Sequence, residues 1–173
     1  MDSIDWQAIS RLQGPLVWRT AHRLLNCDAD AHDCFQETFL SALDVSKKQP
    51  IQNWPGLLQR LATTRALDQL RRRKRETRSR APGEADWDQV ASHQLGPDRH
   101  AQDAELMDNL RSAVSRLPAQ QAEVFCLRHI SGLSYEEIAQ QLEISVDGVG
   151  VSLHRAKHRL RQLLVSACAE ERT

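Results

Sequence analysis

The stretch LPAQQAEVFCLRHISGLSYEEIAQQLEISVDGVGVSLHRAKHRLR, residues 117–161, decides the fold of this protein. Ser134 and Glu137 fit a capping box, in which each side chain accepts a hydrogen bond from the backbone N–H of the other residue. The box opens a short helix, a turn follows at residues 143–144, and Ser145 caps a second, longer helix. Two helices joined by so short a turn are typical of the helix-turn-helix unit.

The longer of the two helices is predicted to be amphipathic, with a basic outer side. Its buried side carries Val149, Leu153, Ala156, Leu160 and Leu164. Its exposed side carries Ser152, His154, Arg155, Lys157, His158, Arg159 and Arg161. The alternative is an ordinary amphipathic helix whose solvated side happens to be basic, but here a cap, a turn and a long helix coincide. The pattern therefore favours a helix that enters the major groove of DNA and reads base edges.

Helical periodicity extends through most of the remaining sequence, and runs of β-branched residues are nearly absent. Apolar residues keep this period over residues 6–25, where Gly14–Pro15 either kinks one helix or starts a second. The next helix is predicted to begin at Asp28 or Asp30 as its N-cap, and a third at Asn53. The sequence therefore predicts an all-α protein.

Two small helical domains joined by a flexible linker are expected. Residues from about 77 to 104 lose the helical period and collect Gly and Pro among polar and acidic residues, which is the composition of an interdomain tether. The predicted boundaries are 1–76 for the first domain, 77–105 for a flexible acidic linker and 106–173 for the second domain. A chain of 173 residues with 40% hydrophobic content suffices for two modest cores.

The formal net charge of zero conceals a segregation of charge along the chain. Residues 71–80 carry seven positive side chains against Glu76 alone, whereas residues 28–44 carry five acids and no Lys or Arg. The basic block has an alternative reading as a solubilising cluster that complements the helix dipole. Beside a DNA-binding unit, neutralisation of phosphates is the better account.

The sequence gives no reason to expect a cofactor, a metal or catalysis. Cys27, His32 and Cys34 lie close together, but their spacing fits no common structural zinc pattern, and Cys34 belongs to an apolar stripe. No Ser/His/Asp or carboxylate pair argues for an enzyme. Without a secretory signal or an apolar run of roughly 18 to 20 residues, a cytoplasmic protein with reduced thiols and no membrane contact is expected.

Three stretches resemble the extracytoplasmic-function (ECF, group 4) class of bacterial sigma-70 family RNA polymerase sigma factors: DAHDCFQETFLSAL at 30–43, LATTRALDQLRRRKR at 61–75, and the stretch at 117–161. The resemblance implies that the first domain is sigma region 2, a helical bundle, and that the second is sigma region 4. It implies a factor that binds core RNA polymerase and directs promoter-specific transcription initiation. Region 2 would read and help to melt the promoter −10 element, and region 4 would read the −35 element.

The resemblance also implies the protein partners. The acidic helix would dock on the β′ clamp helices of the polymerase through five residues: Asp30, Asp33, Gln36, Glu37 and Phe39. Its charge suits a basic partner. Region 4 would meet the β flap, and an anti-sigma factor would hold the protein inactive. No catalytic residue is implied, because phosphodiester synthesis belongs to the polymerase.

Two sets of DNA contacts follow from the resemblance. The set for the −10 element is Lys47, Lys48, Asn53, Trp54, Arg60, Thr63, Thr64, Arg65, Asp68, Arg71, Arg72, Arg73 and Lys74. The set for the −35 element is Ser134, Tyr135, Ser145, Asp147, Gly148, Ser152, His154, Arg155, Lys157, His158 and Arg159.

The chain departs from the family pattern at two places. Thr63–Thr64 stands where the family usually shows Arg-Asn, so those polar contacts do not carry over directly, and Arg65 is the nearest substitute. Gly148 and Gly150 lie where a Thr-Val-Lys-Ser-Arg run is common, so a lysine and an arginine are missing. Each glycine costs a helix roughly 1 kcal/mol relative to alanine. The glycines therefore predict either close backbone approach to DNA or a frayed first turn.

Two other functions stay open from the sequence. The first is a helix-turn-helix transcription regulator that never engages polymerase and uses its N-terminal helices for dimerisation or sensing. The second, weaker hypothesis is a nucleic-acid enzyme that holds Mg²⁺ on Asp30, Asp33 and Glu37, although two-metal sites usually gather carboxylates from several elements.

Overall fold

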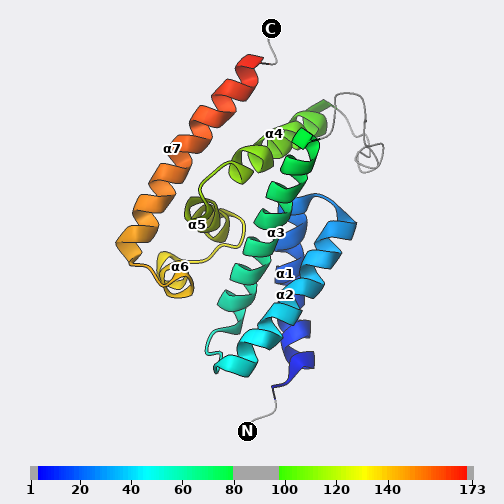
Figure 1. Ribbon diagram of the computed structural model, residues 1–173, viewed down its shortest axis with the longest axis vertical. Helices are drawn as coiled ribbons and strands as arrows, with labels where there is room; N and C mark the ends of the chain where they lie inside the picture. The colour runs from blue at the N-terminus through cyan, green and yellow to red at the C-terminus, as the bar shows by residue number, and fades with distance from the viewer. Residues whose placement is uncertain (1–3, 80–97, 171–173) are drawn as a thin grey trace.

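The computed structural model describes residues 4–79 and 98–170 of the chain. These residues form helices and connecting turns without a strand, which confirms the all-α prediction. The helices are α1 (Trp6–Leu25), α2 (Asp28–Lys48), α3 (Trp54–Ser79), α4 (Asp98–Ser115), α5 (Ala119–His129), α6 (Tyr135–Leu142) and α7 (Val146–Glu170). Helices α1–α3 form an N-terminal module and α4–α7 a C-terminal module, and the two lie side by side (Figure 1).

The N-terminal module is a bundle of three helices around a small apolar core. Val17 of α1, Ala42 of α2, and Leu58 and Ala62 of α3 have no exposed surface and form its centre. Partly buried aromatic side chains from all three helices surround this centre. Burial of these apolar residues, which recur at helical spacing, explains why the three helices pack as they do.

The predicted helix ends of this module were partly right. Helix α1 continues through Gly14–Pro15 as one helix. The N-cap prediction for Asp28 or Asp30 was wrong, because Cys27 is the N-cap of α2 and its side chain makes no capping bond. Asp28 is the first helical residue and its carboxylate pairs with His22 at 3.1 Å. The Asn53 cap is confirmed, since its Oδ1 accepts a 2.9 Å hydrogen bond from the N–H of Gly56.

The C-terminal module contains the predicted helix-turn-helix in α6 and α7. The capping box is present: the N–H of Ser134 donates to Glu137 Oε2 at 2.7 Å, and the N–H of Glu137 donates to Ser134 Oγ at 3.1 Å. Gly132, shortly after α5, has φ +77°, a left-handed conformation that glycine adopts without steric cost. The core beneath α5, α6 and α7 includes Leu127, Ile138 and Val149, none of which is exposed.

The two modules share a third apolar cluster, which includes Leu24 of α1, Leu67 of α3, Val114 of α4 and Leu160 of α7. The helix bounds differ from the predicted linker limits of 77 and 105, because α3 extends to Ser79 and α4 begins at Asp98. The rest of the predicted linker lies outside the described residues. Because they share this apolar cluster, the two modules are packed together.

Candidate nucleic-acid interface

The first turn of α7 is fully formed and capped. Ser145 Oγ accepts a 3.0 Å hydrogen bond from the N–H of Gly148, and the Ser145 carbonyl accepts another of 3.0 Å from Val149. A side chain at position 148 would place its Cβ 3.1 Å from Ser145 Oγ, so glycine relieves crowding at the cap. The frayed first turn considered from the sequence is therefore not observed.

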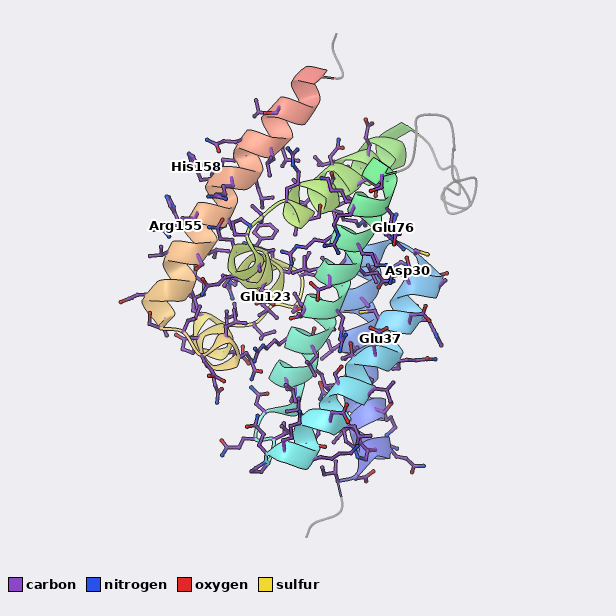
Figure 2. All side chains as sticks on the ribbon, in the orientation of Figure 1. Asp30, Glu37, Glu76, Glu123, Arg155 and His158 are labelled. Atoms are coloured by element: carbon purple, nitrogen blue, oxygen red, sulfur yellow. The ribbon has the colours of Figure 1, made fainter. Side chains whose placement is uncertain are left out.

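Helix α7 presents a basic side to solvent. Figure 2 shows Arg155 and His158 projecting away from the rest of the module. Among the residues predicted for the −35 element, the exposed ones are Ser145, Asp147, His154, Arg155, Lys157, His158 and Arg159. The half-buried ones are Ser134, Tyr135, Gly148 and Ser152. The structure thus brings this set together along one helix and its preceding turn.

Tyr135 has a structural contact that the sequence did not reveal. The guanidinium of Arg128 lies 5.5 Å from the centre of the Tyr135 ring, an attractive cation–π arrangement, and Arg128 Nη1 donates to the Leu133 carbonyl at 2.9 Å. A Cβ on Gly150 would lie 3.9 Å from the same ring, which is ordinary contact. The Tyr135 ring therefore joins α5, α6 and the start of α7.

Val151 is a further candidate residue that sequence reasoning missed. Its side chain is 49% exposed although it is apolar, and it precedes Arg155 by one helical turn. Helical periodicity could have predicted this exposure, because Val151 falls outside the buried stripe that contains Val149 and Leu153.

Only some of the predicted polymerase-binding side chains of α2 are exposed to solvent. Asp33, Gln36 and Glu37 are exposed, as contact with a protein partner requires. Asp30 instead forms an ion pair with Arg73 of α3, and its side chain is 25% exposed. Phe39 packs on Phe35, with ring centres 4.9 Å apart, and belongs to the core of the N-terminal module. The predicted polymerase-binding set therefore divides into three exposed side chains and two that are half-buried.

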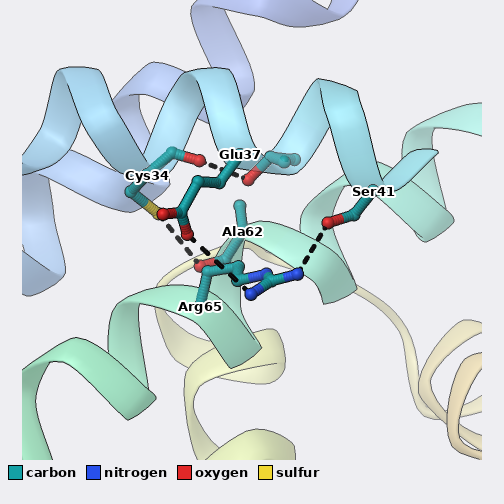
Figure 3. Close-up of polar contacts among 6 residues, drawn as sticks. Cys34, Glu37, Ser41, Ala62 and Arg65 are labelled. Carbon is teal, nitrogen blue, oxygen red and sulfur yellow. Dashed lines mark hydrogen bonds and ion pairs between the residues drawn. The ribbon is translucent and has the colours of Figure 1, made fainter. Parts of the chain in front are cut away.

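Glu37 and Arg65 connect the predicted polymerase face to α3 (Figure 3). Arg65 Nη1 lies 3.8 Å from Glu37 Oε2, and Arg65 Nη2 donates to Ser41 Oγ at 2.9 Å. Beneath this pair, Cys34 Sγ donates to the Ala62 carbonyl at 3.6 Å. Burial raises the pKa of the Cys34 thiol to about 11, so the thiol stays protonated near neutral pH. Arg65 thus lies against α2, with its side chain 48% exposed.

Several residues predicted for the −10 element make contacts within the N-terminal module. Asn53 caps α3, and Trp54 packs edge to face on Trp6 with ring centres 5.2 Å apart. Arg73 donates to the Leu25 carbonyl at 3.2 Å besides its ion pair with Asp30. Lys47, Lys48, Arg65, Asp68 and Arg72 are exposed, whereas Arg60 is half-buried.

Three of the remaining four residues of this set, Thr64, Arg71 and Lys74, lie on the side of α3 that approaches the C-terminal module. Thr63 has no exposed surface. Thr64 Oγ1 donates to Glu123 Oε1 of α5 at 3.0 Å, and Arg71 Nη2 donates to the Leu117 carbonyl at 3.4 Å. Lys74 Nζ donates to Ser112 Oγ of α4 at 3.2 Å. In this arrangement the predicted −10 surface is divided between solvent and the other module.

The described residues contain neither a metal-binding cluster nor a helix that could cross a membrane. No cluster of three or more His, Cys, Asp or Glu side chains suitable for a metal is found there. Cys126 is a free buried thiol whose pKa burial raises to about 12. In the same part of the chain, none of the helices has the length and apolar character that crossing a bilayer requires.

Two family models match this chain. Residues 10–76 match Sigma-70 region 2, and residues 107–160 match Sigma-70 region 4. Together these two stretches cover more than half of the chain and coincide with the N-terminal and C-terminal modules.

Comparison with individual proteins also finds sigma factors that are similar to this chain. The chain is 33% identical over 167 residues to the ECF RNA polymerase sigma factor SigE of Mycolicibacterium smegmatis, covering 96% of this chain but 64% of that protein. It is 30% identical over 171 residues to the RNA polymerase sigma-E factor of Streptomyces avermitilis, covering 94% of this chain and 87% of that protein. A solved structure of CnrH in complex with the cytosolic domain of CnrY has the same fold, with a TM-score of 0.59 at 22% identity, over 94% of this chain and 91% of that one.

Proposed function

We propose, because this chain belongs to the extracytoplasmic-function class of the sigma-70 family, that it binds core RNA polymerase and directs promoter-specific transcription initiation. The N-terminal module would read the −10 element and the C-terminal module the −35 element. The observation that carries the proposal is the capped helix-turn-helix whose second helix, α7, exposes Arg155, Lys157 and Arg159 along one side.

The acidic side of α2 supports engagement of the polymerase. Asp33, Gln36 and Glu37 are exposed on one helix, and a negatively charged surface favours docking on a basic partner. The described residues include no metal-binding cluster that would support the alternative of a metal-dependent nucleic-acid enzyme. We therefore assign α2 to polymerase binding.

A protein inhibitor is part of the proposal. The structural neighbour CnrH was solved in complex with the cytosolic domain of CnrY, and the sigma factor RpoE of Bartonella quintana with the anti-sigma factor NepR. By analogy with those complexes, an anti-sigma factor is proposed as a partner of this chain. Such a factor would compete with the polymerase for the exposed surfaces of the two modules.

Run-off transcription with purified core RNA polymerase and a promoter library tests the proposed function. We expect transcripts from a subset of promoters that depends on this protein, and alignment of their start sites would reveal both promoter elements. DNA binding without transcripts, with a core enzyme shown competent with another sigma factor, would instead support the polymerase-independent regulator.

Val151 is predicted to contact a thymine methyl group in the −35 element. The C5-methyl of thymine is the apolar group that the major groove presents, and Val151 offers an exposed apolar side chain beside Arg155. Replacing thymines one at a time by deoxyuridine, which lacks that methyl, should weaken binding at one position by about 1 kcal/mol, or roughly fivefold. Fluorescence anisotropy with duplexes selected by the promoter library measures this loss.

The Val151→Ala variant should no longer distinguish thymine from deoxyuridine at that position. The matched control is Val165→Ala, because Val165 is also an exposed valine of α7, 70% exposed, but lies near the other end of the helix. A variant at Val151 that retains the full preference for thymine would remove this residue from the reading surface.

A further inference from the structure

His32 of α2 contacts a residue of the docking surface, defined here as the exposed side chains Asp33, Gln36 and Glu37. His32 and Gln36 are four positions apart, which places them on adjacent turns of one helix. Their side-chain nitrogens, His32 Nδ1 and Gln36 Nε2, are 3.2 Å apart, and both side chains are exposed. His32 was not among the residues predicted to bind the polymerase, but it touches one of them.

The chemistry of the two groups fixes the direction of this hydrogen bond. A side-chain amide nitrogen carries two hydrogens and does not accept, so Gln36 Nε2 donates and His32 Nδ1 accepts. A neutral imidazole whose Nδ1 accepts carries its proton on Nε2. The neutral form of His32 therefore binds the donor end of the Gln36 amide.

The ring of His32 is itself held by α1. Trp18 contacts His32 edge to face, with ring centres 6.3 Å apart and ring planes at 75°. Trp18 is partly buried against the apolar cluster that the two modules share, and its ring centre lies 6.5 Å from that of Phe35. An exposed imidazole that packs on a half-buried indole has fewer orientations than one in open solvent. Trp18 thus favours the ring orientation in which Nδ1 reaches Gln36.

The amide oxygen of Gln36 is consequently the end that a partner can reach. Among the described residues no group donates a hydrogen bond to Gln36 Oε1, whereas Nε2 is bound to His32. A basic partner presents N–H donors, which require acceptors on the opposing surface. The neighbouring carboxylates of Asp33 and Glu37 only accept when ionised. An outward amide oxygen therefore makes the whole docking surface an acceptor surface.

We infer that His32 is a positioning residue for polymerase binding, which, while neutral, holds the Gln36 amide with its oxygen directed toward the partner. This inference rests on the proposed function and deepens it. A proton taken from solvent adds a hydrogen to Nδ1, which then donates and no longer accepts. The amide turns to offer Oε1 to the imidazolium, and its N–H groups then face the basic partner. Protonation therefore replaces an acceptor with donors and adds a positive charge to the docking surface.

The other charged and titratable groups near His32 are paired or belong to the docking surface. On α1, His22 contacts the same Trp18 ring, with ring centres 6.1 Å apart, and pairs with Asp28 at 3.1 Å. The remaining groups are Asp30, Asp33 and Glu37 of α2, and Arg65 and Arg73 of α3, which pair with Glu37 and Asp30. His22 is the one other histidine in contact with Trp18, so its titration needs a separate control.

A binding titration of fluorescent core RNA polymerase with the full-length protein tests the inference. It is run at about pH 8 and about pH 5.5, on either side of the range in which histidine ordinarily changes charge. Affinity is expected in full at the higher pH and to be lost as His32 gains its proton. The loss between the two pH values should be roughly fivefold greater in the wild type than in His32→Ala, the factor that one hydrogen bond supplies.

Two histidine controls keep this comparison specific. His129→Ala removes another exposed histidine whose ring packs on an aromatic side chain, and His22→Ala removes the second histidine on Trp18. Both variants should retain the pH dependence of the wild type. An equal pH dependence in the wild type and His32→Ala, or its loss in His22→Ala instead, would overturn the inference.

Substitutions that fix the hydrogen-bonding character of position 32 give the two extremes. The carboxylate of His32→Glu accepts at both pH values, so this variant should bind core enzyme at both at least as tightly as the wild type does at the higher pH. The ammonium of His32→Lys only donates, so this variant should bind at both as weakly as the wild type does at the lower pH. Equal affinities for His32→Glu and His32→Lys would contradict the proposed role.

A double-mutant cycle separates positioning from a direct effect of charge. If His32 acts through Gln36, the effect of His32→Ala should disappear in a chain that also carries Gln36→Ala. The charge of His32 would act on the partner whether or not Gln36 is present. The same effect of His32→Ala in the two backgrounds would therefore overturn the positioning role.

Nuclear magnetic resonance of the protein without polymerase separates failure of the inference from failure of the proposed function. At about pH 8, His32 should carry its proton on Nε2, and the side-chain N–H signals of Gln36 should shift on acidification to about pH 5.5 in the wild type but not in His32→Ala. A proton on Nδ1 at the higher pH, or Gln36 signals insensitive to pH, would overturn the inference even if the protein binds polymerase. The expected spectra from a protein that binds no core enzyme would refute the proposed function while establishing the His32–Gln36 contact.

Discussion

Replacing Gln36 and Glu37 together with alanine is expected to lower the affinity of the protein for core RNA polymerase roughly a hundredfold and to abolish promoter-specific transcription. Both side chains are exposed on α2, on the acidic surface proposed to dock on the polymerase. Truncation of two central contacts in an interface commonly costs about 3 kcal/mol in total, which corresponds to that factor. Run-off transcription and a binding titration with fluorescent core enzyme measure the two effects.

The fold should survive this double substitution. Glu37 loses only its 3.8 Å ion pair with Arg65, in which the side chains are 59% and 48% exposed, and such surface pairs contribute about 0–1 kcal/mol. A matched control is Gln162→Ala with Glu105→Ala, which removes one exposed amide and one exposed carboxylate elsewhere. If the control lost transcription equally, or the variant at 36 and 37 kept it, α2 would not be the docking surface.

Replacing Ile138 with alanine is expected to destabilise the helix-turn-helix by about 2–5 kcal/mol and to abolish binding to the −35 element. Ile138 has no exposed surface and lies in the cluster that joins α5, α6 and α7. Helix α6 has eight residues, too few to be stable without tertiary packing. Loss of this side chain therefore removes the contact that positions α6 against α7.

Urea unfolding followed by circular dichroism measures the loss of stability at Ile138, and anisotropy with a promoter duplex measures binding. Ile138→Val should cost about 0.5–1.5 kcal/mol, because it removes a single methylene. Gln140→Ala on the exposed side of the same helix should change stability by less than about 0.5 kcal/mol. Equal stabilities for Ile138→Ala and Gln140→Ala would contradict the assigned core.

Much of the local structure was predictable because its causes lie within a few residues of sequence. The capping box at Ser134 and Glu137 and the cap at Asn53 depend on side chains that bond backbone groups three residues away. The exception is α2, whose N-cap is Cys27 with no side-chain capping bond, while the Asp28 carboxylate contacts His22 of α1. Gly148 also needed the structure, because crowding against Ser145 Oγ appears only once the cap is built.

The candidate site was predictable in composition but not in accessibility. Sequence periodicity placed Arg155 on the outer side of α7, where it is exposed. It did not show that Asp30 pairs with Arg73 or that Thr64 bonds to Glu123. Those contacts join different helices, and the residues in one helix do not specify which side chain of another lies opposite.

By itself, the sequence determined that the chain is all-helical, where most helices begin, and that it resembles a two-domain sigma factor, because periodicity, caps and motifs are local properties. Only the tertiary structure decided that the two modules dock, with Thr64 of α3 bonded to Glu123 of α5, 59 residues away. That contact depends on the shapes of two assembled surfaces and on a shared apolar cluster that buries residues such as Leu67 and Val114. Neither module carries a sequence pattern that fixes its orientation on the other.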